Sequence, residues 1–229
     1  MNKMNSETQK VVERYEKRKS SDLVLKSSDN YFYNHFIQSE RELKYAEILY
    51  KHFQSLDSVK FLEIGAGTGV NLFFLKKTGL KWENIYANEL IPDRIKILRD
   101  TFPQVRIYEG DAMSLQFPGI DSFDVIFQST VFTSLLDYNF KMGLAGKMWN
   151  LLKPGGMILW YDFAFDNPKN KDVKGIKKAE IRKLFPASKS IIFHKVTLAP
   201  PIGRRINKLY PLFNVFPFLR THIIAEIEK

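Results

Sequence analysis

The sequence contains no cysteine, which excludes a disulfide framework, a thiolate metal site and a cysteine nucleophile. It has only four histidines, and they are too widely spaced along the chain to predict a zinc site. No apolar run approaches the ~20 residues that a membrane-spanning helix needs, and the N-terminus has no apolar signal-peptide core. We therefore expect a cytoplasmic protein without a metal or a transmembrane segment.

Positive charge is concentrated near the C-terminus. Residues 59–163 carry 11 basic and 11 acidic side chains, whereas residues 164–229 carry 14 basic and 5 acidic ones. Nearly all of the net charge of +10 therefore comes from the last third of the chain. Such a region favours an anionic partner, namely a phosphorylated substrate, a nucleic acid or a lipid surface. A solvated basic face that only aids solubility is an equally good interpretation.

Short apolar runs alternate with helical patterns after residue 58, which predicts an α/β domain with a parallel sheet and helices on both faces. The expected strands are 59–64, 84–88, 105–108, 123–128, 156–163, 190–198 and 222–228, and the helices between them are 66–79, 92–101 and 139–152. One domain is expected over 59–229, with basic insertions at about 164–189 and 199–221 on the acceptor side. Residues 1–58 are expected to form an N-terminal helical extension, with helices at 11–19 and 36–53.

A glycine-rich turn, "LEIGAGTG", separates the first strand from the first helix of this domain. Glycines there let the backbone approach a ligand closely, as in a nucleotide cradle. The spacing of Gly65, Gly67 and Gly69 differs from the dinucleotide fingerprint G-x-G-x-x-G. Glu63, directly before the turn, would repel a pyrophosphate and instead suits a ligand with an ammonium or sulfonium group.

Two further acids follow the next two strands. Glu89 lies twenty residues after Gly69, where a carboxylate can accept hydrogen bonds from a ribose diol. Asp111, in "EGDAMSL", follows the third strand, where it could receive an adenine amino group. In doubly wound sheets the ligand lies at the carboxyl ends of the strands, so all three acids are expected at one site.

In this order and spacing, "LEIGAGTG", "ANEL", "GDAMSL" and "LLKPGGMILW" resemble the class I S-adenosylmethionine-dependent methyltransferases over residues 59–163. The resemblance implies their Rossmann-like, seven-stranded, mostly parallel sheet and S-adenosylmethionine as the cofactor. The cofactor-binding residues that it implies are Glu63, Gly65, Ala66, Gly67, Gly69 and Asn71 around the methionine end, Glu89 at the ribose, Leu90, Asp111 and Ala112 at the adenine, and Gln128 and Ser129 beside the transferable methyl group.

A narrower resemblance covers the second half of the chain. "QSTVFTSLLD", "LWYDF", "DVKGIKKAEIRKLFP" and "VTLAPPIGRR" are similar to a group of bacterial methyltransferases that often accompany glycosyltransferases in surface-polysaccharide pathways. This implies O-methylation of a sugar, in a surface glycan or its nucleotide-linked precursor. The alternatives are an RNA or other small-molecule methyltransferase and a non-catalytic cofactor-binding protein. A nucleic-acid partner is disfavoured because "QSTV" stands where an amino-methylating motif would be.

A sugar hydroxyl is a poor nucleophile, so a general base would assist its methylation. Asp162 ends the strand in "WYDF", where we expect an exposed carboxylate on the acceptor rim, and His222 begins the last strand. These two residues are the candidate catalytic groups, although each could be structural.

The candidate substrate-binding residues are aromatic or basic. Tyr31, Tyr33 and Tyr161 could present rings to a sugar, and Arg204 with Arg205 could bind a phosphate through their guanidinium groups. The apolar segment "LYPLFNVFPFL" that follows could form a lid over the acceptor pocket, a dimer contact or a membrane contact. The sequence predicts no oligomeric state.

Overall fold

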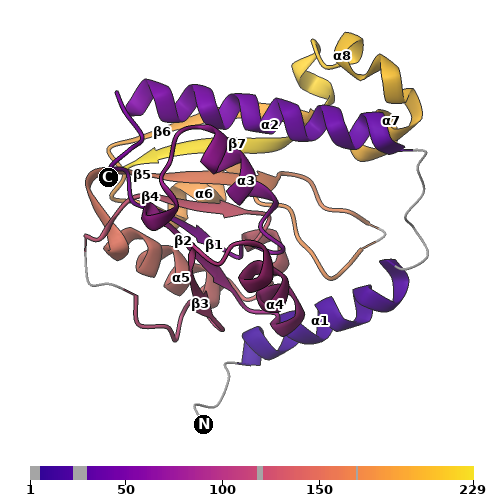
Figure 1. Cartoon of the computed structure of the whole chain (residues 1–229). Coiled ribbons are helices and arrows are strands. Elements are labelled where there is room, and N and C mark those ends of the chain that lie inside the picture. Colours follow the sequence, from indigo (N-terminus) through magenta and orange to yellow (C-terminus); the bar gives the residue numbers. More distant parts are fainter. Residues whose placement is uncertain (1–5, 23–29, 118–120, 169) are drawn as a thin grey trace.

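The computed structural model describes residues 6–22, 30–117, 121–168 and 170–229 (Figure 1). Seven strands form one sheet in the order β3-β2-β1-β4-β5-β7-β6. Their bounds are β1 Phe61–Ile64, β2 Ile85–Glu89, β3 Arg106–Glu109, β4 Phe123–Ser129, β5 Leu152–Phe163, β6 Ser190–Leu198 and β7 Arg220–Glu228. The strands from β3 to β5 pair in parallel, and β7 is antiparallel to both β5 and β6. The predicted seven-stranded, mostly parallel α/β fold is confirmed.

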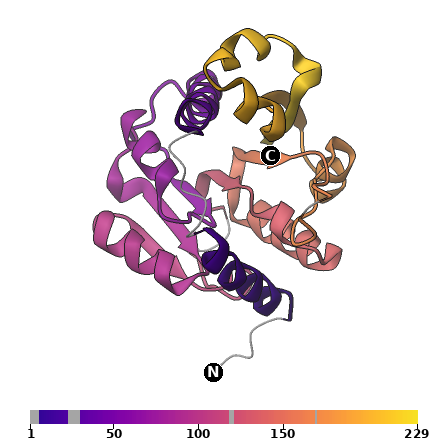
Figure 2. The ribbon, with the colours of Figure 1, turned by 90° about the vertical axis from the view of Figure 1, so that its right-hand side faces the viewer.

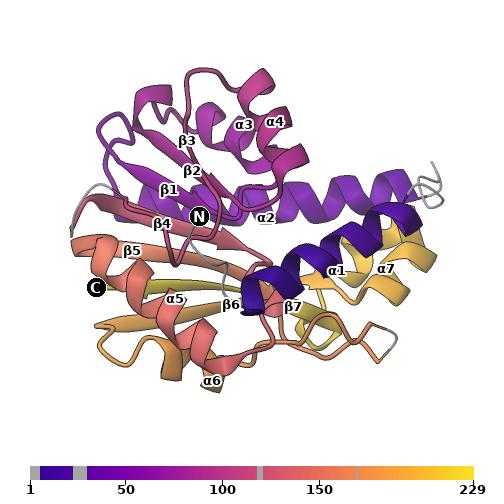
Figure 3. The same ribbon diagram turned by 90° about the horizontal axis from the view of Figure 1, so that it is seen from below.

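Helices cover both faces of the sheet because the side chains of its strands alternate between them. On β1, Leu62 and Ile64 belong to one buried apolar cluster, whereas Phe61 belongs to the other. Helices α5 (Tyr138–Leu151) and α6 (Lys178–Leu184) pack on the first face. Helices α2 (Tyr31–His52), α3 (Val70–Lys77) and α4 (Pro92–Thr101) pack on the second. The remaining long helix, α1 (Ser6–Asp22), lies across the end of the sheet (Figure 3).

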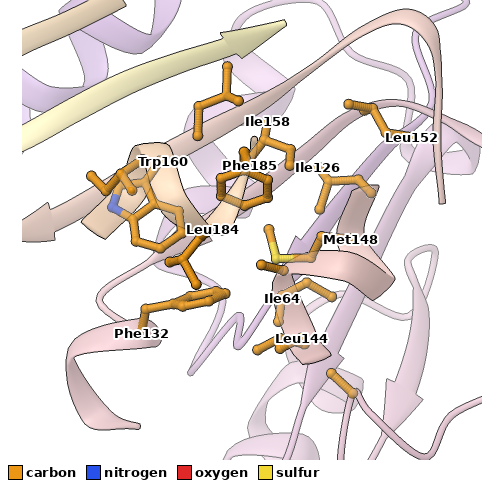
Figure 4. Packing of buried hydrophobic residues seen from close by; sticks show 14 of the residues in the cluster. Ile64, Ile126, Phe132, Leu144, Met148, Leu152, Ile158, Trp160, Leu184 and Phe185 are labelled. Carbon is orange, nitrogen blue, oxygen red and sulfur yellow. The ribbon is translucent and has the colours of Figure 1, made fainter. Parts of the chain in front are cut away.

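An aromatic group forms the centre of the first core (Figure 4). The rings of Phe132 and Trp160 have centroids 4.4 Å apart, and Phe185 from the end of α6 meets Trp160 edge to face at 6.0 Å. All three side chains are buried. Such aromatic pairs add about 0.5–1.5 kcal/mol beyond the area that they bury, so this group fixes the position of α6 against β5.

The structure differs from the sequence-based expectation at two places. Strand β5 begins at Leu152 rather than at residue 156, because backbone groups of Gly155 and Gly156 pair with Lys229 at the end of the chain. No secondary structure was predicted for residues 200–219. They form the short helical segments α7 (Pro200–Ile206), η4 (Asn207–Leu209), α8 (Tyr210–Phe213) and η5 (Pro217–Leu219), which pack beside the N-terminal end of α2 (Figure 1).

No helix among the described residues is long and apolar enough to cross a membrane.

Gly69, the residue that precedes α3, requires the absence of a side chain. Its φ is +84°, and an added Cβ would lie 2.3 Å from the ring of Phe102 and 2.9 Å from Leu98. Left-handed backbone and overpacking together predict that Gly69→Ala lowers the free energy of unfolding by about 2–4 kcal/mol. Urea denaturation of the variant and of wild type measures this difference.

Gly146 provides the matched control. It lies in α5, and an added Cβ would meet no atom within 4 Å. Gly146→Ala should leave stability unchanged or raise it by about 1 kcal/mol, because alanine is the better helix former. Equal stability of the two variants would contradict the packing argument for Gly69.

Candidate active site

A cavity of about 420 Å³ opens at the carboxyl ends of β1, β2 and β4. Nine of the predicted cofactor-binding residues line it: Gly65, Ala66, Gly67, Asn71, Glu89, Leu90, Asp111, Ala112 and Ser129. Glu63, Gly69 and Gln128 are not among the lining residues, but each adjoins a lining residue in the chain, and Glu63 also bonds Asn71 of the wall. The sequence motifs therefore converge on one concave site, although they are up to 64 residues apart in the chain.

The carboxylate of Glu89 holds the glycine turn in place. Its Oε2 accepts a hydrogen bond from the backbone N–H of Gly67 at 2.7 Å, and its Oε1 accepts from the N–H groups of Leu90 and Ile91 at 2.9 and 2.8 Å. The side chain is buried. Glu89 thus joins the end of β2 to the turn after β1, a structural role that the sequence did not reveal beside the predicted ribose contact.

Glu63 is a buried acid, and only one of its two carboxylate oxygens accepts a hydrogen bond among the described residues. Its Oε1 accepts a hydrogen bond from Asn71 Nδ2 at 2.6 Å, whereas its Oε2 has no hydrogen-bond partner among the described residues. Burial raises the pKa of Glu63 from its ordinary value of 4.5 to about 8, and the nearby carboxylate of Glu89 acts in the same direction. A cationic group placed beside Oε2 would satisfy this atom and stabilise the ionised form.

Helix α1 covers the mouth of the cavity through Thr8, Val11 and Tyr15 (Figure 2). The Thr8 hydroxyl donates a 2.7 Å hydrogen bond to Asp111 Oδ2, and the backbone N–H of Met113 donates to Asp111 Oδ1 at 2.9 Å. Both carboxylate oxygens of the predicted adenine contact therefore already accept one bond.

On the other side of the mouth, α1 is held to the segment after β4. Glu7 Oε1 accepts a hydrogen bond from the backbone N–H of Leu136 at 2.8 Å, and Arg14 donates to the carbonyl of Ser134 at 2.9 Å. The aromatic ring of Tyr15 contacts the guanidinium of Arg94 at 4.4 Å. The spacing of Thr8, Val11 and Tyr15 on one helix face was a usable sequence signal for this contact.

Asp162 is buried, so the expectation of an exposed carboxylate on the rim is wrong. Its Oδ1 accepts a bond from Thr133 Oγ1 at 2.6 Å and its Oδ2 accepts from Gln128 Nε2 at 3.1 Å. Gln128 Oε1 in turn accepts from the backbone N–H of Val131 at 3.0 Å. Burial raises the pKa of Asp162 to about 7. The carboxyl group therefore supports the loop of residues 128–131, three of which line the cavity.

The cavity wall contains two cations that the sequence analysis missed, Arg94 of α4 and Arg41 of α2. The Arg41 guanidinium lies 4.9 Å from the centre of the Tyr161 ring, which also stacks on the ring of His222 at 5.3 Å. Burial and the charge of Arg41 lower the pKa of His222 to about 4, so this imidazole is neutral at pH 7. Arg41 stands four residues before the buried Tyr45, a spacing that would have placed it on the core side of α2.

The other candidate substrate residues lie away from the cavity. Tyr33 is buried against Gly203 and Tyr210, and Tyr31 is exposed at the start of α2. Arg204 and Arg205 are exposed on α7. Neither predicted insertion contributes a lining residue to the cavity, because both lie beyond β5 at the outer edge of the sheet. Among the described residues, no cluster of three or more His, Asp or Glu could hold a metal ion.

Known proteins resemble this chain in one domain and in the fold. Residues 62–160 match the family model described as a methyltransferase domain. No curated protein matches the chain. A SAM-dependent methyltransferase from Archaeoglobus fulgidus is similar in structure, with a TM-score of 0.57 and 16% identity over 86% of this chain and 99% of that one.

Two further structures share the fold. An S-adenosylmethionine-dependent methyltransferase from Mesorhizobium loti has a TM-score of 0.58 and 13% identity, covering 80% of this chain and 98% of that chain. The [4+2]-cyclase SpnF has a TM-score of 0.59 and 14% identity, covering 81% and 80%. The family match identifies residues 62–160 as a methyltransferase domain. The protein is therefore an enzyme that uses S-adenosylmethionine, and the solved structures share its fold.

The pKa of Glu63 predicts a pH-dependent loss of stability. The folded protein keeps a proton on Glu63 up to about pH 8, whereas the unfolded chain loses it near pH 4.5. The unfolding free energy must therefore fall as the pH rises through this window. Glu63→Gln removes this component, so its stability relative to wild type should increase by roughly 2–4 kcal/mol between pH 4.5 and 8.5. Denaturation of both proteins across this range measures the change, and parallel pH curves would contradict it.

Glu89→Ala should weaken both the fold of the glycine turn and the binding of cofactor. The variant leaves three backbone N–H groups without their acceptor and removes the predicted ribose contact. We expect affinity for S-adenosylhomocysteine to fall by about 100-fold, since each charged hydrogen bond contributes about 1.5–3 kcal/mol. Calorimetric titration measures this affinity. Glu109→Ala, at the register partner of Glu89 on β3, is the control and should bind as wild type does.

Proposed function

We propose that this methyltransferase transfers the methyl group of S-adenosylmethionine to a hydroxyl oxygen of a sugar, in a surface glycan or its nucleotide-linked precursor. The observation that supports this proposal most directly is the polar wall of the cavity next to the glycine turn. Ser129, Thr130, Ser134 and Tyr15 present hydroxyl groups there, beside the guanidinium of Arg41. Side chains of this kind match the dense hydroxyl pattern of a sugar, and Arg41 also suits a phosphate of a nucleotide-linked substrate.

The opposite part of the cavity fits the cofactor. Ala112, Leu90, Ile91 and Val11 provide an apolar surface for a flat adenine ring. Glu89 retains one lone pair, on Oε2, for a ribose hydroxyl after accepting its three backbone bonds. The unpartnered Oε2 of Glu63 suits the ammonium group of the methionine end, which would also satisfy this buried atom.

S-adenosylmethionine supplies a methyl group that its sulfonium charge already activates. The chain therefore has to align the acceptor oxygen with that methyl group, and such positioning can contribute up to ~7–11 kcal/mol. Three residues of the loop 128–131 line the cavity, and we place the acceptor against this loop. Asp162 acts on this loop through Gln128 and is a positioning residue, since it does not line the cavity. Neutral His222 acts through Tyr161 on the orientation of Arg41.

The proposed contact between Glu63 and the ammonium group of the cofactor predicts that cofactor binding releases a proton from this side chain. Glu63 carries a proton at pH 7 because its pKa is about 8, and a cation beside Oε2 favours its loss. Titration of the full chain with S-adenosylhomocysteine in buffers of different ionisation enthalpy should show release approaching one proton at pH 7, and none for Glu63→Gln. Equal proton release by the two proteins would remove Glu63 from the methionine site.

Asp162→Asn tests the positioning role. Asparagine keeps the shape of the side chain but has only one acceptor oxygen. Its amide NH₂ group would face the donor group of either Thr133 or Gln128. We expect turnover to fall by about 10- to 100-fold with cofactor affinity within a factor of two of wild type. Thr78→Val, at a buried hydroxyl that bonds the carbonyl of Leu75 in α3 rather than the loop, is a packing control. Wild-type turnover of the variant would refute the positioning role.

The acceptor is identified by direct detection of the methylated product. The full chain is incubated with S-adenosylmethionine carrying a labelled methyl group and with a panel of nucleotide sugars and glycan fragments. A labelled nucleotide sugar or glycan supports the proposal. Label that appears instead in RNA, or in a non-carbohydrate metabolite pool, would refute it. Detecting the methyl group itself is necessary because a [4+2]-cyclase shares this fold.

A further inference from the structure

The segment between β6 and β7, residues 199–219, has an inner side that packs on α2 and an outer side that is exposed to solvent. Its inner side chains, Ile206, Tyr210, Phe213 and Leu219, pack with Tyr33, Phe36 and Ile37 of α2. Its outer side chains are also apolar. Leu209, Leu212 and Phe216, from the same segment, are exposed to solvent rather than packed on α2. The segment is therefore apolar on the face that it buries and on the face that it exposes.

Exposed apolar and basic side chains on this segment and at the start of α2 define the apolar–basic patch. Its members are Tyr31, Phe32, Ile202, Leu209, Leu212, Val215, Phe216, Phe218, Arg204, Arg205 and Lys208. The eight apolar members are almost half of the large apolar side chains exposed among the described residues, and Leu212 and Phe218 are 64% and 76% exposed. Lys208 lies 4.9 Å from the ring of Phe32, which joins the two parts of the patch.

Internal hydrogen bonds hold the segment in shape without using the patch. Glu40 of α2 accepts bonds from Tyr210 Oη at 2.6 Å, from Asn214 Nδ2 at 2.9 Å and from the backbone N–H of Thr197 at 3.0 Å. Arg220 Nε donates to the side chain and carbonyl of Asn214. The outer apolar side chains are thus presented by a fixed scaffold, and their exposure is not explained by the folding of the segment itself.

The positive charge of this part of the chain indicates which kind of partner the patch binds. Residues 181–225 contain eight basic residues and no acidic residue. A second copy of this chain would bring Arg204, Arg205 and Lys208 against themselves in a two-fold interface, which like charges oppose. A nucleic acid would leave the aliphatic Leu209, Leu212 and Val215 without a suitable partner. A bilayer with acidic headgroups matches both properties, because acyl chains receive the apolar side chains and headgroup phosphates receive the cations.

We propose that residues 199–219, together with the start of α2, bind the surface of an anionic membrane. The apolar side chains enter the boundary between headgroups and acyl chains, and Arg204, Arg205 and Lys208 contact lipid phosphates. Helix α7 lies at the same end of the sheet as α1, which covers the cavity (Figures 1 and 3). Binding in this way holds the cavity end of the enzyme near the membrane.

Co-sedimentation of the full chain with vesicles tests this surface. Vesicles of phosphatidylcholine mixed with phosphatidylglycerol should bind the protein, and vesicles of phosphatidylcholine alone should bind it far more weakly. Added salt should release it, because exposed charges are screened. Each basic residue near an anionic surface contributes about fivefold in affinity, so the triple variant Arg204→Gln, Arg205→Gln, Lys208→Gln should bind on the order of 100-fold more weakly.

Matched variants separate the patch from general charge and hydrophobicity. The double variant Leu212→Ser, Phe218→Ser should bind at least about tenfold more weakly. Lys60→Gln, Lys81→Gln, Lys96→Gln removes three exposed charges elsewhere, and Leu43→Ser removes an apolar side chain that is 73% exposed on α2. Both controls should bind as wild type does. Thermal melting by circular dichroism confirms that each variant is folded.

Three results would overturn the proposal: equal binding to the two kinds of vesicle, unchanged binding of the triple variant, or equal losses in the controls. Retention by single-stranded nucleic acid with no binding to anionic vesicles would also overturn it. The vesicle assay requires neither cofactor nor acceptor, so its outcome is independent of the proposed methylation of a sugar.

Discussion

The site depends on one carboxylate that joins the ends of two parallel strands. Glu89 is buried at the end of β2, and its three backbone hydrogen bonds reach the turn after β1 as well as its own turn. Asn88 beside it continues the connection, because its Nδ2 donates to the carbonyls of Tyr108 and Gly110 after β3. Three loops that would otherwise be independent are thereby fixed as one wall of the cavity. Burying this charge is offset by the number and geometry of its donors.

Burial also determines the protonation of the groups behind the cavity. It raises the pKa of Glu63 to about 8 and that of Asp162 to about 7, and it lowers the pKa of His222 to about 4. All three shifts favour the neutral form, which is the less costly form in a medium of low polarity. These three groups therefore add little fixed charge behind the cavity, and the cations of its wall are Arg41 and Arg94.

The wall of the cavity is built from two parts of the chain. Residues 62–160 match the methyltransferase domain, and they supply most of the wall where we place the cofactor. The remaining wall comes from α1 and from Arg41 of α2, which lie outside this match. The segment 199–219 lies outside it too and packs on α2. The proposed acceptor site therefore combines residues of the domain with α1 and α2, whereas the proposed membrane surface lies outside the domain.

The sequence alone determined the order of strands and helices, the glycine turn and the identity of most residues in the cavity wall. These features are local, since strand alternation, helix periodicity and the φ of glycine are properties of neighbouring residues. It did not reveal that α1 covers the cavity, that Arg41 enters it, or that Asp162 is buried rather than exposed. Nor did it place Arg204 and Arg205 away from the cavity. Those facts depend on which distant segments meet, as when Thr8 bonds Asp111 across 103 residues. The tertiary structure decided these facts, through the packing of α1 and α2 on the sheet and the pairing of the strands beyond β5, because the burial of a residue depends on the whole fold.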